Sequence, residues 1–375
     1  NYDFTSSIQM YETLSGSNND RYQYVLPSFN FSKNFNLENI NGSFNFNSSG
    51  NNTLRNTNIT TSSILNDLDY STVNTFFENG IKAKLNVFLK NINSVGKNNP
   101  TYKNSPQSEL MSAYSYDTSL PLIKKNSKTF NTLEPKLSLR FSPHEMKNNS
   151  NSSRRIDNSN IFASNRLSLG DSFEAGESIT LGLDFKKEKI NTNNKIKEME
   201  EYIDFKLASV FRLDEEKNMP TNSTLNKKSS NIFGQFNFKP LDNVSLGYNF
   251  SLTDDLDKLE YSSLITEMNY RNFSTQFDYL EETGVIGKTN IIANKTQYNF
   301  NNANSFSFST RRNRKINLTE YYDLVYEYNN DCLIAGIKYN KKYYNDVDIK
   351  PVEQLFFSIT IVPLGTFSPD KMVLK

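Results

Sequence analysis

The residues that could do chemistry are few in this chain. It holds a single histidine, His144, which follows Pro143, and a single cysteine, Cys332. A lone histidine with no cysteine and no defined serine or aspartate partner makes neither a catalytic triad nor a zinc site, and no glycine-rich phosphate loop is present. The sequence therefore predicts no enzyme, no bound cofactor and no metal.

Two features have the residue types of a binding or cross-linking site. Arg311, Arg312, Arg314 and Lys315 are clustered, and arginine forks suit phosphate and carboxylate groups, although a solvated loop is the plainer interpretation. One cysteine cannot form an internal disulfide. In an exported chain, Cys332 is expected to have a partner outside the segment or to remain a free thiol.

The elements that carry these residues are predicted to be long strands. Tyr321 to Phe367 contains three segments in which apolar and polar residues alternate with a period of two, and Asn329-Asn330-Asp331 forms the turn after the first. Cys332 begins the polar face of the second segment. The third has an apolar face made of Leu355, Phe357, Ile359 and Ile361. Such strands approach the roughly 9–11 residues that a tilted strand needs to cross a bilayer.

The composition also favours membrane strands. Hydrophobic residues make up 36% of the 375 residues and the mean hydropathy is −0.64, values typical of a chain that buries little. The 28 Phe and 21 Tyr residues are nevertheless placed in alternation, as in a barrel where every second residue faces lipid. Roughly 16–18 such segments recur. We predict an all-β, antiparallel transmembrane β-barrel over residues 1–375, incomplete on its N-terminal side.

This prediction also assigns sides to the loops and faces. If the chain ends in the periplasm, the basic cluster and the long polar connections Ser142 to Gly176 and Leu213 to Ser229 are extracellular. A polar set would face the lumen: Lys82, Lys84, Asn86, Glu327 and Lys338.

A soluble β-sandwich or solenoid is the alternative, but a solenoid needs a fixed repeat and none is visible. A net charge of +1 with interspersed charges argues against nucleic-acid binding.

Four ordered stretches resemble the C-terminal barrel portion of the lipopolysaccharide-assembly outer-membrane protein family, LptD. The most distinctive is Asp157 to Phe185, DNSNIFASNRLSLGDSFEAGESITLGLDF, with its Asn-Arg and Glu-x-Gly elements. The others are Asp20 to Lys33 (DRYQYVLPSFNFSK), Leu120 to Pro143, and the terminal NNDCLIAGIKYNKKYYNDVDIKPVEQLFFSITIVPLG. Residues 51 to 115 add little to the resemblance.

The resemblance implies a function in the outer membrane of Gram-negative bacteria. Proteins of this family pass lipopolysaccharide through the barrel and a lateral gate into the outer leaflet, with a lipoprotein plug (LptE-like) and periplasmic jelly-roll bridge proteins (LptA-like) as partners. The family's own jelly-roll domain and first barrel strands would then be absent from this chain. A general porin or channel is the alternative; an outer-membrane protease or lipase and a surface adhesin are further ones.

The resemblance also implies roles for particular residues. Cys332 would form a disulfide with the family's N-terminal portion, and the basic cluster would lie near lipid A phosphates. The closing strand, Val352 to Gly365, would form one side of the lateral gate. Its gate residues would be Leu355, Phe357, Ile359, Ile361 and Pro363. Pro363 would weaken strand pairing at the seam, because proline has no N–H. An ordinary strand-ending proline is the plainer interpretation.

Overall fold

The computed structural model describes residues 2–12, 22–35, 41–55, 58–99, 102–191, 198–343, 351–362, 365–367 and 372–373. Within them the chain is all-β apart from one 3-10 turn, Thr221–Ser223. In this part of the chain, no helix has the length and apolar character needed to cross a membrane. The chain forms two compact units. The first comprises residues 1–122, 134–183 and 208–230; the second comprises residues 123–133, 184–207 and 231–375.

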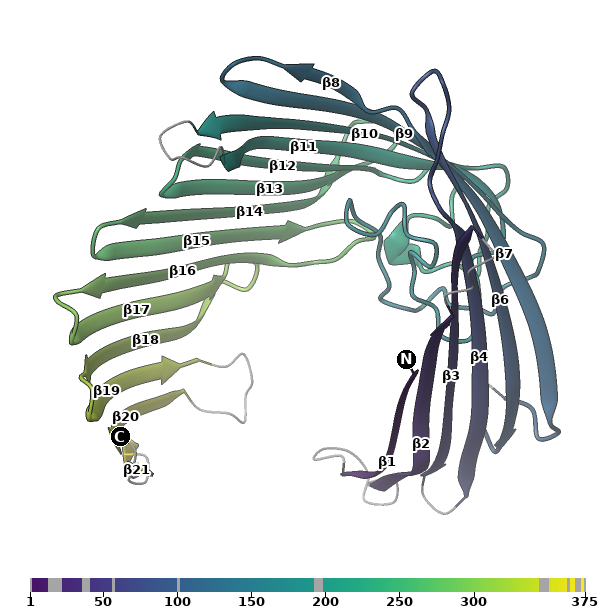
Figure 1. Ribbon diagram of the computed structural model, residues 1–375. Helices are drawn as coiled ribbons and strands as arrows, with labels where there is room; N and C mark the ends of the chain where they lie inside the picture. Colours follow the sequence, from purple (N-terminus) through teal and green to yellow (C-terminus); the bar gives the residue numbers. More distant parts are fainter. Residues whose placement is uncertain are drawn as a thin grey trace. The chain divides into compact units, whose positions relative to one another are not determined.

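The first unit is a series of antiparallel strands that follow one another along the chain (Figure 1). Each long strand up to β9 pairs with the next one. The strands are β1 (Tyr2–Glu12), β2 (Tyr22–Phe35), β3 (Gly42–Arg55), β4 (Ile59–Thr72), β5 (Thr75–Phe76), β6 (Lys82–Lys97) and β7 (Gln107–Ser119), with parts of β8 (Leu122–Lys125), β9 (Thr129–Ser142), β10 (Gly176–Asn191) and β11 (Glu198–Arg212).

The second unit continues the same up-and-down order from β12 to β20 (Figure 1). Its strands are β12 (Ile232–Leu241), β13 (Val244–Leu252), β14 (Leu259–Tyr270), β15 (Phe273–Glu282), β16 (Asn290–Asn299), β17 (Asn304–Asn313), β18 (Leu318–Asn329), β19 (Leu333–Lys342), β20 (Val352–Ile361), β21 (Gly365–Phe367) and β22 (Met372–Val373). Among the described residues of both units, 18 strands have nine residues or more, which agrees with the number of segments expected from alternation.

The two faces of the strands are inverted relative to a water-soluble sheet. In β9, Ser138, Arg140 and Ser142 are buried, whereas Leu139 and Phe141 between them are 42% and 44% exposed. β10 repeats the pattern: Ser178 and Thr180 are buried, while Ile179 and Leu181 are exposed. Polar side chains on the covered face and apolar side chains on the open face are what a strand in a bilayer requires.

The three predicted strands at the end of the chain are confirmed as β18, β19 and β20, and their apolar faces lie in register. Tyr326 pairs with Ile337, which pairs on its other side with Phe357. The predicted closing strand, Val352 to Gly365, is present as β20 but ends at Ile361. Gly365 pairs back with Ile361, and the short strands β21 and β22 pair with β20 near its two ends.

Candidate functional site

The long connection between β9 and β10 folds back onto the covered face of the first unit. The sequence predicts a polar connection here, yet residues 143–175 include some of the most buried side chains in the described chain. Ile161 and Leu167 are 1% and 2% exposed, and Phe173 is buried as well. The connection is therefore a packed element, and residues 143–175 are named the inner loop below.

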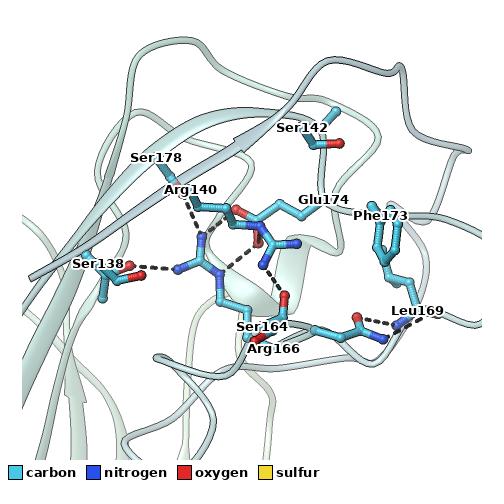
Figure 2. A network of polar contacts seen from close by, with 12 residues as sticks. Ser138, Arg140, Ser142, Ser164, Arg166, Leu169, Phe173, Glu174 and Ser178 are labelled. Atoms are coloured by element: carbon cyan, nitrogen blue, oxygen red, sulfur yellow. Dashed lines mark hydrogen bonds and ion pairs between the residues drawn. The ribbon is translucent and has the colours of Figure 1, made fainter. Parts of the chain in front are cut away.

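The distinctive Asn-Arg and Glu-x-Gly elements anchor the inner loop. The guanidinium of Arg166 forms a fork with the carboxylate of Glu174: Nε donates to Oε2 at 2.7 Å, and Nη2 donates to Oε1 (Figure 2). Arg166 also donates to the hydroxyls of Ser178 and Thr180 on β10, at 3.1 and 3.0 Å. One side chain thus closes the loop and ties it to the neighbouring strand.

Two further arginines from the strands converge on the same carboxylate. Arg212, at the end of β11, donates from Nη1 to Glu174 Oε1 at 2.8 Å and from Nη2 to the carbonyl of Ala175 at 2.5 Å. Arg140 of β9 holds the Ser164 carbonyl through Nη1, and its Nε lies 3.8 Å from Glu174 Oε2 (Figure 2). Arg140, Arg166 and Arg212 are called the arginine triad below.

Burial and charge act in opposite directions on Glu174. Burial alone would raise the pKa of this carboxyl, but the guanidinium groups of Arg166, Arg140 and Arg212 outweigh it and lower the pKa to about 2. Glu174 is therefore ionised at any physiological pH. A buried carboxylate held in this way is stable only while its cationic partners remain in place.

Gly176, the residue after Ala175, is required by this geometry. Its φ is +77°, in the left-handed region that glycine adopts without strain. A Cβ at this position would also lie 3.2 Å from Nη2 of Arg212. The glycine of the Glu-x-Gly element therefore allows the chain to turn from the inner loop into β10 beside the arginine.

A second anchor seats the inner loop on β6 and β7. Phe173 packs against a cluster of buried apolar residues that includes Phe88, Ile92 and Met111. Lys90 lies beside it with Nζ 5.3 Å from the ring centroid, 2.5 Å from Asp67 Oδ1 and 3.0 Å from the carbonyl of Gly170. The loop is thus held by an apolar contact and a lysine bridge as well as by the arginine triad.

The connection between β11 and β12 packs against the inner loop. The amide of Asn149 donates to the carbonyl of Asn218 at 2.7 Å, and the amide of Thr221 donates to the carbonyl of Ser150 at 3.3 Å. Met219 and Leu225 are fully buried. Both long polar connections predicted from the sequence therefore belong to one packed layer.

The alternation predicts Cys332 on the polar face of β19. In the structure, Cys332 lies instead in the turn between β18 and β19. The side-chain oxygen of Asn330 accepts hydrogen bonds from the amides of Cys332 and Leu333, at 3.0 and 2.8 Å, so the strand begins one residue later. The thiol is exposed and free. Pro363, the last of the predicted gate residues, lies outside the described residues. Phe357, Ile359 and Ile361 are exposed on β20.

The four residues of the predicted basic cluster lie in two different settings, one in a strand and one at a hollow beside the loops. Arg311 and Arg312 belong to β17 and not to a loop, because they pair with Ala293 and Ile292 of β16. Arg311 forms an ion pair with Glu320 at 2.9 Å, and Arg312 donates to Asn317. Arg314 and Lys315 line a hollow at the adjoining loops together with Lys288, Glu281 and Glu282. Carboxylates therefore lie beside part of this positive charge.

Two residues of the polar set predicted to face a lumen bind polar partners outside that set. Asn86 is buried and donates to Ser115 at 2.9 Å and to Asp117 at 2.7 Å. Lys338 forms an ion pair with Asp323 at 3.1 Å. Lys82, Lys84 and Glu327 are half-buried.

His144, expected to have no serine partner, lies with Nε2 3.3 Å from the hydroxyl of Ser112.

Long antiparallel strands with apolar open faces and polar covered faces define a membrane-spanning β-barrel protein of the bacterial outer membrane. A protein-family model gives the particular family. Residues 1–302 match LptD, described as LPS transport system D, and the chain belongs to this family. The match ends before Cys332 and β20, so the roles implied for them remain predictions.

Among solved structures, several outer-membrane proteins are similar at a low level. The ferric enterobactin receptor PfeA of Pseudomonas aeruginosa has 7% identity and a TM-score of 0.42, covering 96% of this chain and 68% of its own. The siderophore receptor PirA of Acinetobacter baumannii has 8% identity and a TM-score of 0.39, and the match covers 96% of this chain and 74% of the receptor. The copper transporter OprC has 10% identity and a TM-score of 0.36, and the match covers 96% of this chain and 68% of the transporter. Similarity this weak carries no argument about the present chain. No curated protein sequence matches it.

Proposed function

We propose that this chain is the barrel part of a lipopolysaccharide translocon subunit, which delivers the lipid into the outer leaflet. The observation that carries the proposal is the family match over residues 1–302, whose most distinctive stretch is the buried Arg166–Glu174 anchor. The polar covered faces of the strands would offer the saccharide part of the lipid a hydrated path. The chain acts as a conduit in this proposal and catalyses no reaction.

The proposal includes partners and a gate. A lipoprotein plug would occupy the interior, and jelly-roll bridge proteins would deliver lipid from the periplasm. Strand β20 would form one side of the lateral opening. Pairing on its second edge is recorded at Gln354, Leu355 and Ile359–Ile361, through two short strands instead of one continuous strand. The exposed thiol of Cys332 would form the disulfide with the N-terminal portion of the protein.

Depletion of the full-length protein in its host tests the proposal. Lipopolysaccharide at the cell surface is expected to fall while the lipid accumulates in the inner membrane and periplasm. If surface lipopolysaccharide is unchanged and uptake of small solutes falls, the chain is a diffusion channel and the transport proposal is refuted.

A further inference from the structure

The arginine triad has three guanidinium groups but only one carboxylate in direct contact with them. Three guanidinium groups surround Glu174, which is the one carboxylate within ion-pair distance of them in the described part of the chain. Asp117 and Glu216 act on Arg140 and Arg212 at longer range. Within ion-pair distance, three guanidinium groups thus meet a single carboxylate, although Arg140 and Arg166 are at least nine-tenths buried.

The hydrogen-bonding capacity of the triad is also incompletely used. Nε of Arg140 is buried and has no hydrogen-bond partner in the structure, and at 3.8 Å its contact with Glu174 is an ion pair without a hydrogen bond. Leaving a buried charged donor unsatisfied costs free energy that a suitable acceptor would recover. An anion with more oxygens and more charge than one carboxylate would suit these three forks better.

Glu174 also occupies a distinctive position in the chain. Arg140 and Arg212 belong to strands, whereas Glu174 belongs to the inner loop, so its contacts with these two arginines join the loop to the strands. Without the carboxylate, the loop would keep its contacts through Phe173 and Lys90 and the hydrogen bonds that the triad makes to Ser178, Thr180 and the carbonyls of Ser164 and Ala175. The segment around Glu174 would be held less firmly to β9 and β11.

We propose that the arginine triad is a phosphate site at which a phosphate group replaces the Glu174 carboxylate and thereby loosens the part of the inner loop around Glu174. The inference rests on the proposed function, because the lipid carried by the family supplies phosphate groups on its headgroup. A phosphate near −2 would place one more negative charge in contact with the three guanidinium groups than the Glu174 carboxylate does. Arg140 would donate through the Nε that is now unpaired, and Glu174 would move with the loop.

The test uses the unaltered full-length protein with its partners in lipid nanodiscs. Amide hydrogen exchange in residues 160–176 is followed during titration with diphosphoryl lipid A, with fully dephosphorylated lipid A and with inorganic phosphate. Diphosphoryl lipid A is expected to accelerate exchange at least tenfold while the dephosphorylated lipid has no effect. Acceleration by inorganic phosphate at similar concentration would also support a phosphate site and assign it to the free anion.

Two variants test the assignment to the triad. Arg140→Gln is expected to raise the half-maximal concentration of diphosphoryl lipid A at least tenfold. Arg154→Gln removes one charge from an exposed arginine of the same loop and is expected to leave that concentration unchanged. Equal acceleration by both lipids, or none, refutes the phosphate site even if Arg140→Gln fails to fold. Because depletion tests transport separately, that result would leave the proposed function intact.

Discussion

The substitution Glu174→Gln tests how strongly the arginine triad holds the inner loop. The carboxyl has a pKa of about 2 in the folded chain against an ordinary value of 4.5. This difference corresponds to roughly 3 kcal/mol of stabilisation at neutral pH. The figure agrees with the ~3–5 kcal/mol lost when one partner of a buried ion pair is removed. Glutamine has a similar shape and volume but no charge, so the free energy lost is that of the electrostatic contacts of Glu174.

The assay is amide hydrogen exchange of the full-length protein at neutral pH without added lipid A. A loss of roughly 3 kcal/mol in a local opening reaction predicts exchange about a hundredfold faster in residues 160–176. Glu177→Gln is the matched control, since Glu177 is exposed and three residues away. Peptides from β13 and β14 are expected to be unchanged, because the effect is a local opening.

Either of two results would refute this reasoning. If exchange in Glu174→Gln stays within threefold of the unaltered protein, the triad does not hold the loop. If Glu177→Gln accelerates exchange equally, any loss of negative charge near β10 suffices, and the specific contact with the arginines is irrelevant.

Three other outcomes are expected. Because the folded pKa of Glu174 lies below its unfolded value, its stabilisation is complete above about pH 4.5 and is lost as the pH falls towards 2; amide protection factors in residues 160–176, which are corrected for the intrinsic exchange rate at each pH, should therefore be lower at pH 3 than at pH 5, and Glu174→Gln should abolish this difference. Gly176→Ala should lower stability by about 1–3 kcal/mol in urea titrations monitored by heat-modifiable migration, because alanine is strained at φ +77° beside Arg212; unchanged migration would contradict this. Cys332 should be labelled by maleimide in the full-length protein only after reduction, and labelling without reductant would exclude the proposed disulfide.

The sequence allows the strands to be predicted wherever one face is consistently apolar. β18, β19 and β20 are recognised because apolar residues recur at every second position along each of them. In the structure, Tyr326, Ile337 and Phe357 of these apolar faces meet in register. β4 gives no such signal, because both of its faces carry polar residues, with Asn66 on one and Asp67 on the other. Asp67 is paired with Lys90 and Asn66 with Ser48 and Asn91, contacts that a single strand does not reveal.

The candidate site could be predicted in part. The Asn-Arg and Glu-x-Gly elements mark Arg166 and Glu174, which lie eight residues apart and meet within one loop. Arg212 lies 38 residues from Glu174 and belongs to another strand, so its contact depends on how the strands pair. The same holds for Phe173, whose seat on β6 and β7 is formed by residues distant in sequence.

The alternation of exposed and buried side chains also affects how such a chain is exported. Machinery that inserts helices into the inner membrane responds to about 20 consecutive apolar residues. In β9, Ser138, Arg140 and Ser142 interrupt the apolar residues at every second position, and the mean hydropathy of the whole chain is −0.64. The unfolded polypeptide therefore resembles a secreted one. Its lipid-facing surface is created only when the strands pair, after the chain has left the membrane through which it was exported.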